Sequence, residues 1–466
     1  MLPSLCRGSM GRHMGWLLLL AIVFALLSIS AAKDTIVPGD VVQDDDFLVS
    51  ANGRFSMGFF TPGRSKFRYL GIWYSTVPVQ TVVWVANRDR PLIDSTGVLS
   101  IFGNGSLVLS DSKGTVYWST GSASDVINPV ATLLNDSNFV VTSSGAMGAS
   151  LRGGPVWQSF DYPTDTLMSG MKIGWDLRSG RNHNLTSWRS ADDPAPGEYF
   201  LVIGTPEDPQ VFLLEKKVRI WRSGPWIGKQ FSGVPVPTNS LRCRFNLLRS
   251  ADEVYVGYDA LDGSLLTRAV VQPTGEADYM VWNEKAQAWT RFWFAPRDRC
   301  DTMSTCGTFG LCDVTSEPQI CSCVRGFVPC SPQNWDMGDS SDGCMRRAPV
   351  DCRNGTDRFV PLSGVKLPDT TEASVDHAMG LEQCRLACLR NCSCTGYANS
   401  EVTGAGGRGC ILWTGNLTDL RSSAEGGPDL FVRVAAADLG EPAHPRYSYF
   451  LLKNTQCFLN KVIKVL

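Results

Sequence analysis

Cysteine is distributed very unevenly along this chain of 466 residues. Of its 16 cysteines, one, Cys243, lies between residues 33 and 294, whereas thirteen lie from Cys300 to Cys410. A long segment without disulfides must be held together by a hydrophobic core, while short cysteine-rich segments bury too little apolar surface to fold without covalent links. The sequence therefore predicts large core-packed units followed by small disulfide-stabilised ones.

The first 32 residues have the pattern of a secretory signal peptide. Basic Arg7 and Arg12 precede an apolar run from Trp16 to Leu27, and small residues follow up to Ala32. An N-terminal membrane anchor is the alternative, but the run is shorter than the roughly 20 apolar residues that span a bilayer. We therefore expect cleavage after Ala32 and export to the extracellular space (the apoplast), where cysteines can pair.

Six Asn-x-Ser/Thr triplets agree with export. Such triplets in an exported chain indicate glycosylated surface loops. They begin at Asn104, Asn135, Asn184, Asn354, Asn391 and Asn416. Asn391 is the weakest candidate, because a bridge at its neighbour Cys392 could hide it.

Charge and composition exclude several function classes. The formal net charge of -2 provides no basic face for nucleic acid, so no nucleic-acid partner is expected. The motifs of kinase chemistry are missing, and the three histidines after the signal have no nucleophile motif beside them. We expect no catalytic residue, no cofactor and no enzyme activity.

Residues 33–294 have the pattern of short β-strands throughout. Apolar and β-branched runs at residues 55–60, 69–74 and 81–85 are separated by turn residues, and the pattern continues at 97–101, 106–109 and 115–119. An Asn or Asp stands before an apolar strand three times, at Asn52, Asn104 and Asp136. This repeat predicts a three-sided β arrangement with pseudo-threefold symmetry.

The motifs of this region resemble those of a known family. They include Ser-Ala-Asn-Gly-Arg-Phe at 50–55, Tyr-Leu-Gly-Ile-Trp-Tyr at 69–74 and Val-Trp-Val-Ala-Asn-Arg at 83–88. They resemble the bulb-type lectin domain of plant S-domain (G-type lectin) receptor-like serine/threonine kinases. Further motifs at 156–167, 185–190 and 221–226 resemble the S-locus glycoprotein domain, which implies a second, diverged lectin-like β unit.

The cysteines from Cys300 to Cys344 have the order of an EGF-like module, although six cysteines can pair in as many as fifteen ways. The resemblance implies the bridges Cys300–Cys312, Cys306–Cys321 and Cys323–Cys344. Cys330 does not fit the family pattern. It could be a free thiol, pair with Cys243, or mispair, and the pairing of Cys457 is equally open.

The second cysteine cluster, from Cys352 to Cys410, resembles a PAN/apple domain, a helix held against a small sheet. Cys384 and Cys388 stand four residues apart, on one face of a predicted helix. The resemblance implies the bridges Cys384–Cys410, Cys388–Cys394 and Cys352–Cys392. Zinc is the rival interpretation, but there is no Cys-x2-Cys pair and histidine is scarce, so no metal is expected.

Mannose-binding members of the lectin family use Gln-x-Asp-x-Asn-x-Val-x-Tyr. The third repeat keeps Asp136, Asn138 and Val140 of this pattern, with Leu134 and Thr142 in place of Gln and Tyr. The other two repeats keep less. Because sugar hydroxyls would lose partners, we expect the lectin fold to serve as a protein-recognition scaffold, with carbohydrate binding at Asp136, Asn138 and Val140 as the alternative.

The predicted fold is mainly β: a bulb-type lectin β-prism, a second lectin-like S-locus β domain, a small EGF-like module and an α+β PAN/apple domain. The expected boundaries are a signal peptide at 1–32 and domains at 33–154, 155–295, 296–345 and 352–434, with an out-of-family tail at 435–466.

The resemblance implies an ectodomain-type protein, truncated before the membrane span and kinase of full-length relatives in the plasma membrane. Its implied roles are pollen recognition and ligand perception. Its implied partners are a small cysteine-rich protein or peptide, a full-length S-domain receptor or a second copy of itself, and mannose-type glycans in the alternative.

Overall fold

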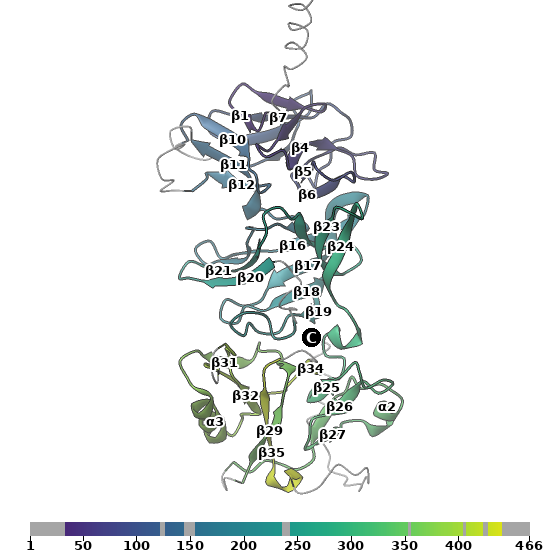
Figure 1. Cartoon of the computed structure of the whole chain (residues 1–466), viewed down its shortest axis with the longest axis vertical. Coiled ribbons are helices and arrows are strands. Elements are labelled where there is room, and N and C mark those ends of the chain that lie inside the picture. Colours follow the sequence, from purple (N-terminus) through teal and green to yellow (C-terminus); the bar gives the residue numbers. More distant parts are fainter. Residues whose placement is uncertain are drawn as a thin grey trace, which may run out of the picture.

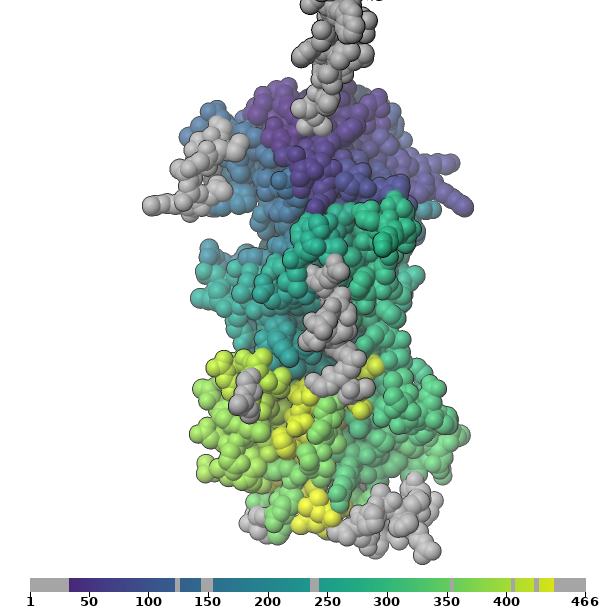
Figure 2. All heavy atoms as spheres, in the orientation of Figure 1, coloured from purple at the N-terminus to yellow at the C-terminus, as the bar shows by residue number. Residues whose placement is uncertain are grey.

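The computed structural model describes residues 33–121, 126–143, 154–234, 243–352, 356–403, 407–422 and 427–439. Its strands form three layers along the longest axis (Figure 1). Among these residues, the first unit holds β1 to β12, the second unit β13 to β24, and the C-terminal unit the remaining strands together with α2 and α3. Figure 2 shows the second unit in contact with both neighbours. The mainly β architecture predicted from the sequence is confirmed.

The first unit consists of three antiparallel four-stranded sheets, as the internal repeat predicts. Alternating side chains of β7 and β8 are buried, so each sheet turns one face to a common core. The sheets are β3 (Phe47–Val49), β4 (Phe55–Phe60), β5 (Tyr69–Tyr74) and β6 (Thr81–Val85); β2 (Val41–Gln43), β7 (Val98–Ile101), β8 (Leu107–Ser110) and β9 (Val116–Ser119); and β1 (Thr35–Ile36), β10 (Pro129–Leu133), β11 (Phe139–Ser143) and β12 (Trp157–Gln158).

The same turn occurs once in each repeat. The side-chain Oδ1 of Asn52, Asn104 and Asp136 accepts a hydrogen bond from the backbone N–H two residues on, at 3.0, 3.1 and 2.9 Å. The residue between has a positive φ in all three turns: Gly53, Gly105 and, in the third, Ser137 at 80°. The turn therefore depends on an Asn or Asp side chain, which is why these residues recur in the sequence.

The second unit repeats the plan of three antiparallel four-stranded sheets, which agrees with the expected second lectin-like unit. One hydrophobic core runs through both units. The sheets are β13 (Thr166–Leu167), β22 (Thr267–Val271), β23 (Ala277–Asn283) and β24 (Ala288–Ala295); β15 (Arg181–His183), β14 (Ile173–Asp176), β21 (Glu253–Ala260) and β20 (Cys243–Arg249); and β16 (Leu185–Ser190), β17 (Asp193–Ile203), β18 (Val211–Glu215) and β19 (Val218–Arg222).

The C-terminal unit joins its two cysteine modules through a shared sheet. β25 of the first module pairs in parallel with β34 of the second, and the two modules share a core. The shared sheet is β26 (Cys321–Cys323), β25 (Gly310–Cys312), β34 (Leu420–Ser422) and β30 (Val365–Lys366). The others are β27 (Phe327–Pro329) with β28 (Cys344–Arg346), and β29 (Arg358–Leu362), β35 (Leu430–Val434), β32 (Gly396–Ala398), β33 (Cys410–Trp413) and β31 (Ala373–Asp376).

The helices of the described residues are short and lie mainly in the C-terminal unit. The predicted helix around Cys384 and Cys388 is confirmed as α3 (Leu381–Arg390), which buries both sulfurs against β32 and β33. The other helices are α2 (Pro332–Asp336) and the 3₁₀ turns η1 (Ser159–Asp161), η2 (Arg299–Asp301) and η3 (Ala436–Leu439). None of the helices among the described residues is long and apolar enough to cross a membrane.

Disulfides hold the C-terminal unit together. The bonded pairs are Cys300–Cys312, Cys306–Cys321, Cys323–Cys344, Cys352–Cys392, Cys384–Cys410 and Cys388–Cys394, the pairs that the resemblance implies. Cys330 is also disulfide-bonded, whereas Cys243 is a buried free thiol. Two of the three possibilities left open for Cys330 are therefore wrong: it is neither free nor paired with Cys243. Cys457 lies outside the described residues.

A buried ionic cluster joins the second unit to the C-terminal unit. The Asp419 carboxylate lies 2.7 Å from Arg222 Nε and 2.7 Å from Lys366 Nζ, and all three side chains are at most 3% exposed. Its other oxygen accepts a hydrogen bond from the backbone N–H of Ser304 at 3.2 Å. One carboxylate thus connects β19, β30 and the first cysteine module.

Candidate functional site

The carbohydrate positions of the third repeat lie together at the start of β11. Asp136 is exposed and closes the turn by its bond to the backbone of Asn138. Val140 is 6% exposed and pairs with Gln158 of β12. The three residues are therefore adjacent, with Asp136 in the turn, Asn138 directly before β11 and Val140 within it.

Asn138 is committed to internal hydrogen bonds. Its side chain is buried: Nδ2 donates to Gln158 Oε1 at 2.9 Å, and Oδ1 accepts from Ser159 Oγ at 3.2 Å and from Phe160 N at 3.3 Å. These partners come from β12 and η1, about 20 residues further along the chain. In this arrangement Asn138 ties the strand to the segment that leads into the second unit.

The predicted glycosylation sites are mostly exposed. Asn104, Asn135, Asn391 and Asn416 are exposed, and Asn184 is half-buried. Cys392 and Asn391 are both exposed. The bridge between Cys392 and Cys352 therefore does not bury Asn391, contrary to the concern raised from the sequence. Asn354 lies outside the described residues.

Three tryptophans meet at the base of the first unit, and sequence reasoning missed their role. Trp84 of β6, Trp118 of β9 and Trp157 of β12 each come from a different sheet. Their ring centroids are 5.8 to 6.1 Å apart and the rings cross at 68 to 77°, the edge-to-face geometry that aromatic rings prefer. The signal was in the sequence, since the last strand of every repeat carries a tryptophan.

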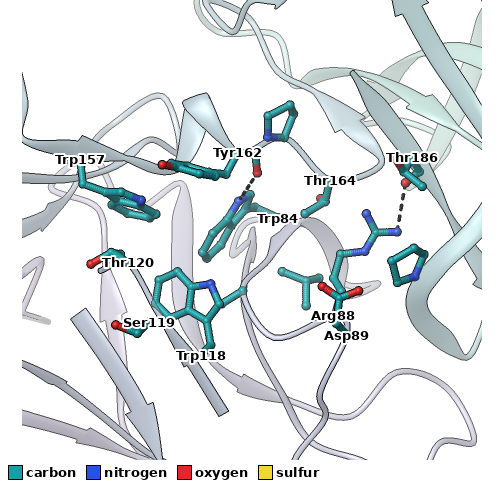
Figure 3. A pocket seen from close by; sticks show the side chains of 14 residues that line it. Trp84, Arg88, Asp89, Trp118, Ser119, Thr120, Trp157, Tyr162, Thr164 and Thr186 are labelled. Atoms are coloured by element: carbon teal, nitrogen blue, oxygen red, sulfur yellow. Dashed lines mark hydrogen bonds between the residues drawn. The ribbon is translucent and has the colours of Figure 1, made fainter. Parts of the chain in front are cut away.

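These tryptophans form one side of a pocket of about 300 Å³ between the first and second units (Figure 3). Tyr162, from the connecting segment, stacks on Trp157 with ring centroids 5.8 Å apart. The backbone carbonyl of Tyr162 accepts a hydrogen bond from Trp84 Nε1 at 2.9 Å. Thr164 and Thr186 line the opposite side, so both units contribute to the pocket.

Arg88 fixes the wall where the two units meet. Its Nε donates to the carbonyl of Pro194 at 2.6 Å, and Nη2 donates to those of Thr186 and Ser187 at 3.0 and 2.6 Å. Burial lowers the pKa of the Arg88 guanidinium, and the nearby Asp165 and other carboxylates oppose that shift. Three bonds to one neighbouring unit make Arg88 a structural anchor of the junction.

Cys306, Cys312 and Cys321 bring three buried sulfur atoms within 4.8 Å of one another. Thiolate is the form of cysteine that binds a metal. All three sulfurs are engaged in the disulfides Cys300–Cys312 and Cys306–Cys321, so this cluster offers no thiolate.

Family models match three parts of the chain. They describe a D-mannose binding lectin (residues 81–189), an S-locus glycoprotein domain (residues 221–331) and a PAN-like domain (residues 352–420).

Whole-chain relatives are similar over most of the sequence. The chain is 43% identical over 422 residues to the receptor-like serine/threonine-protein kinase SD1-8 of Arabidopsis thaliana, covering 90% of this chain and 49% of the relative. It is 39% identical over 401 residues to the S-locus-specific glycoprotein S6 of Brassica oleracea, covering 85% of this chain and 90% of the relative. The chain thus spans about half the length of the receptor-like kinase and most of the glycoprotein.

Among solved structures, the Japanese Marasmius oreades lectin covers 27% of this chain and 90% of its own, with 20% identity and a TM-score of 0.21. The mannose-specific agglutinin of snowdrop (Galanthus nivalis), complexed with methyl-α-D-mannoside, covers 26% of this chain and 100% of its own, with 17% identity and a TM-score of 0.20.

Proposed function

Because this chain belongs to the family of S-locus glycoproteins and S-receptor-like kinases, we propose that it is an extracellular recognition protein that binds protein or peptide ligands without catalysis. The partners we propose are a small cysteine-rich protein or peptide, and a full-length S-domain receptor or a second copy of this chain. Pollen recognition and ligand perception are the roles we propose, with secretion to the apoplast after removal of residues 1–32. The domain boundaries given from the sequence are part of this proposal.

The observation that carries the proposal is the use of the lectin signature as internal structure. Asn138 is buried, and its side chain is hydrogen-bonded to Gln158, Ser159 and Phe160. A sugar that displaced these bonds would leave buried polar groups unpaired, at a cost of about 1–3 kcal/mol for each group. The strand is therefore better suited to a rigid scaffold than to a sugar site.

Rigid coupling between units also supports a recognition role. Tyr74 Oη donates to the Thr267 carbonyl, and Trp289 Nε1 donates to Thr81 Oγ1, each at 2.9 Å across the first junction. The ionic cluster of Asp419, Arg222 and Lys366 connects the second unit to the C-terminal unit. A stiff stack presents a preorganised surface, which lowers the entropic cost of binding a partner.

Capture with the full secreted chain as bait tests the proposal. The bait is covalently cross-linked in native extracellular fluid from reproductive and vegetative tissue, and bound peptides are identified by mass spectrometry. A heat-denatured, reduced bait is the control. We expect small secreted proteins or S-domain receptors that the native bait alone retains; recovery of the same peptides with both baits would contradict the proposal.

The second candidate is a mannose-type lectin that uses Asp136, Asn138 and Val140. The observation that favours it is the match of residues 81–189 to the D-mannose binding lectin model, which includes these positions. Retention on mannan that is lost in Asp136→Ala supports this candidate, and passage of native protein through the column opposes it.

A further inference from the structure

The pocket between the first and second units combines an aromatic wall with a polar rim (Figure 3). Trp118 is partly exposed at the pocket, while Trp84 and Trp157 behind it are buried. Asp89 and Ser119 on the rim are exposed, and Thr120 beside them is half-buried. Aromatic surface next to a few polar groups suits a ligand that has one apolar face and one polar edge.

The rim also holds a carboxylate that is available to a ligand. Asp89 makes no hydrogen bond or ion pair with any described residue, whereas the neighbouring Arg88 has three bonds to backbone carbonyls. Arg88 and Asp89 are neighbours in the chain and both line the pocket, so a positive and a negative charge stand side by side at this wall (Figure 3). Because the two charges offset each other, the rim favours a neutral ligand over an ion of either sign.

We propose that this pocket binds a neutral pyranose, either a free sugar or one residue of a glycan. The C–H face of the ring lies against the exposed part of Trp118, and its hydroxyls donate to the Asp89 carboxylate and bond to Ser119. A volume of about 300 Å³ is at the lower end for ligand pockets, which fits one sugar unit. This site is separate from Asp136, Asn138 and Val140.

Occupation of the pocket couples the two units. Its walls come from Trp118 in the first unit and from Thr164 and Thr186 at the second. A ligand that contacts both sides binds the docked arrangement better than a separated one, so it stabilises the junction by mass action. This inference goes beyond the proposed protein recognition, which does not depend on it.

The test uses the full secreted chain and four defined probes: the methyl glycosides of α-mannose, β-glucose, β-galactose and β-xylose. Saturation-transfer NMR detects binding, and quenching of tryptophan fluorescence gives the dissociation constant. Asp89→Asn and Trp118→Phe alter the pocket. Asp94→Asn, an exposed aspartate of the same unit outside the pocket lining, is the matched control.

We expect at least one glycoside to bind with its ring protons saturated. Asp89→Asn should raise the dissociation constant about tenfold or more, because a charge-assisted hydrogen bond is lost, while Asp94→Asn leaves it unchanged. Trp118→Phe keeps an aromatic ring in the pocket wall and so preserves the fold. Weaker binding by this variant therefore reports the loss of a contact with the ligand. The proposal is overturned if none of the four probes binds, or if binding survives Asp89→Asn and is lost in Asn138→Ala. If none of the four glycosides binds, the pocket proposal fails, but the proposed binding of protein or peptide ligands, which the capture experiment tests, still stands.

Discussion

Neutralising Asp419 should loosen the junction between the second and C-terminal units. Asp419→Asn keeps the shape of the side chain and an oxygen for the Ser304 backbone, but removes the charge that faces Arg222 and Lys366. Both cations are at most 1% exposed, so neither can recover its hydration. Breaking a buried ion pair from one side costs about 3–5 kcal/mol, because an uncompensated charge stays buried.

For a cooperative domain of the size of the C-terminal unit, this loss of folding free energy lowers the unfolding temperature by about 10 °C. Differential scanning calorimetry measures the temperature, and hydrogen exchange shows whether β19, β30 and β34 lose protection together. Asp429→Asn, at an exposed aspartate of the same unit, is the control and should change stability by less than about 0.5 kcal/mol. If Asp419→Asn unfolds like the control, the cluster does not hold the junction.

Three further predictions concern single side chains. Arg433→Met should destabilise the C-terminal unit by about 3 kcal/mol in urea unfolding, because it leaves the Asp357 carboxylate buried without its partner and frees the carbonyls that end α3; an unchanged midpoint would refute this. Burial raises the pKa of the Asp208 carboxyl in the folded protein, so ionising this group at a pH above its unfolded-state pKa destabilises the fold. The stability of Asp208→Asn relative to the wild type should therefore increase from pH 4 to pH 8 in thermal scans. Parallel stability curves for the two proteins would contradict this. Cys243 should resist iodoacetamide until the chain unfolds, since it is buried and burial raises the pKa of its thiol; peptide mass spectrometry of native and denatured samples decides.

Local signals in the sequence were sufficient to predict much of the fold. Strands such as β7 and β8 alternate buried and half-buried positions, which gives a period-two pattern that can be recognised without knowing the partner strand. The recurring Asn or Asp marks a turn in which its own side chain bonds the backbone two residues on. The three-sided arrangement follows from repetition of these local units.

Contacts between distant segments could not be predicted in the same way. The parallel pairing of Leu311 with Leu420 merges two modules that look separate along the chain. Asp419 is an ordinary aspartate until Arg222 and Lys366 are placed beside it. Position in the fold, not residue type, gives these groups their roles.

The carbohydrate positions show the same limit. Asp136, Asn138 and Val140 lie together at the start of β11, but their chemistry depends on what faces them. Gln158 and Ser159 come from the connecting segment and take up the Asn138 side chain. A matched motif therefore predicts which residues belong together, whereas what they do depends on the surrounding structure.

We propose that the lectin-type unit is a scaffold whose signature residues are structural. A glycan array with the full secreted chain, in wild-type and Asn138→Ala forms with complete disulfide pairing checked by mass, tests this most directly. We expect that no binding to mannose-terminated glycans depends on Asn138, and that Asn138→Ala lowers the stability of the first unit by about 1–3 kcal/mol. Selective mannose binding that a folded Asn138→Ala protein loses would contradict it.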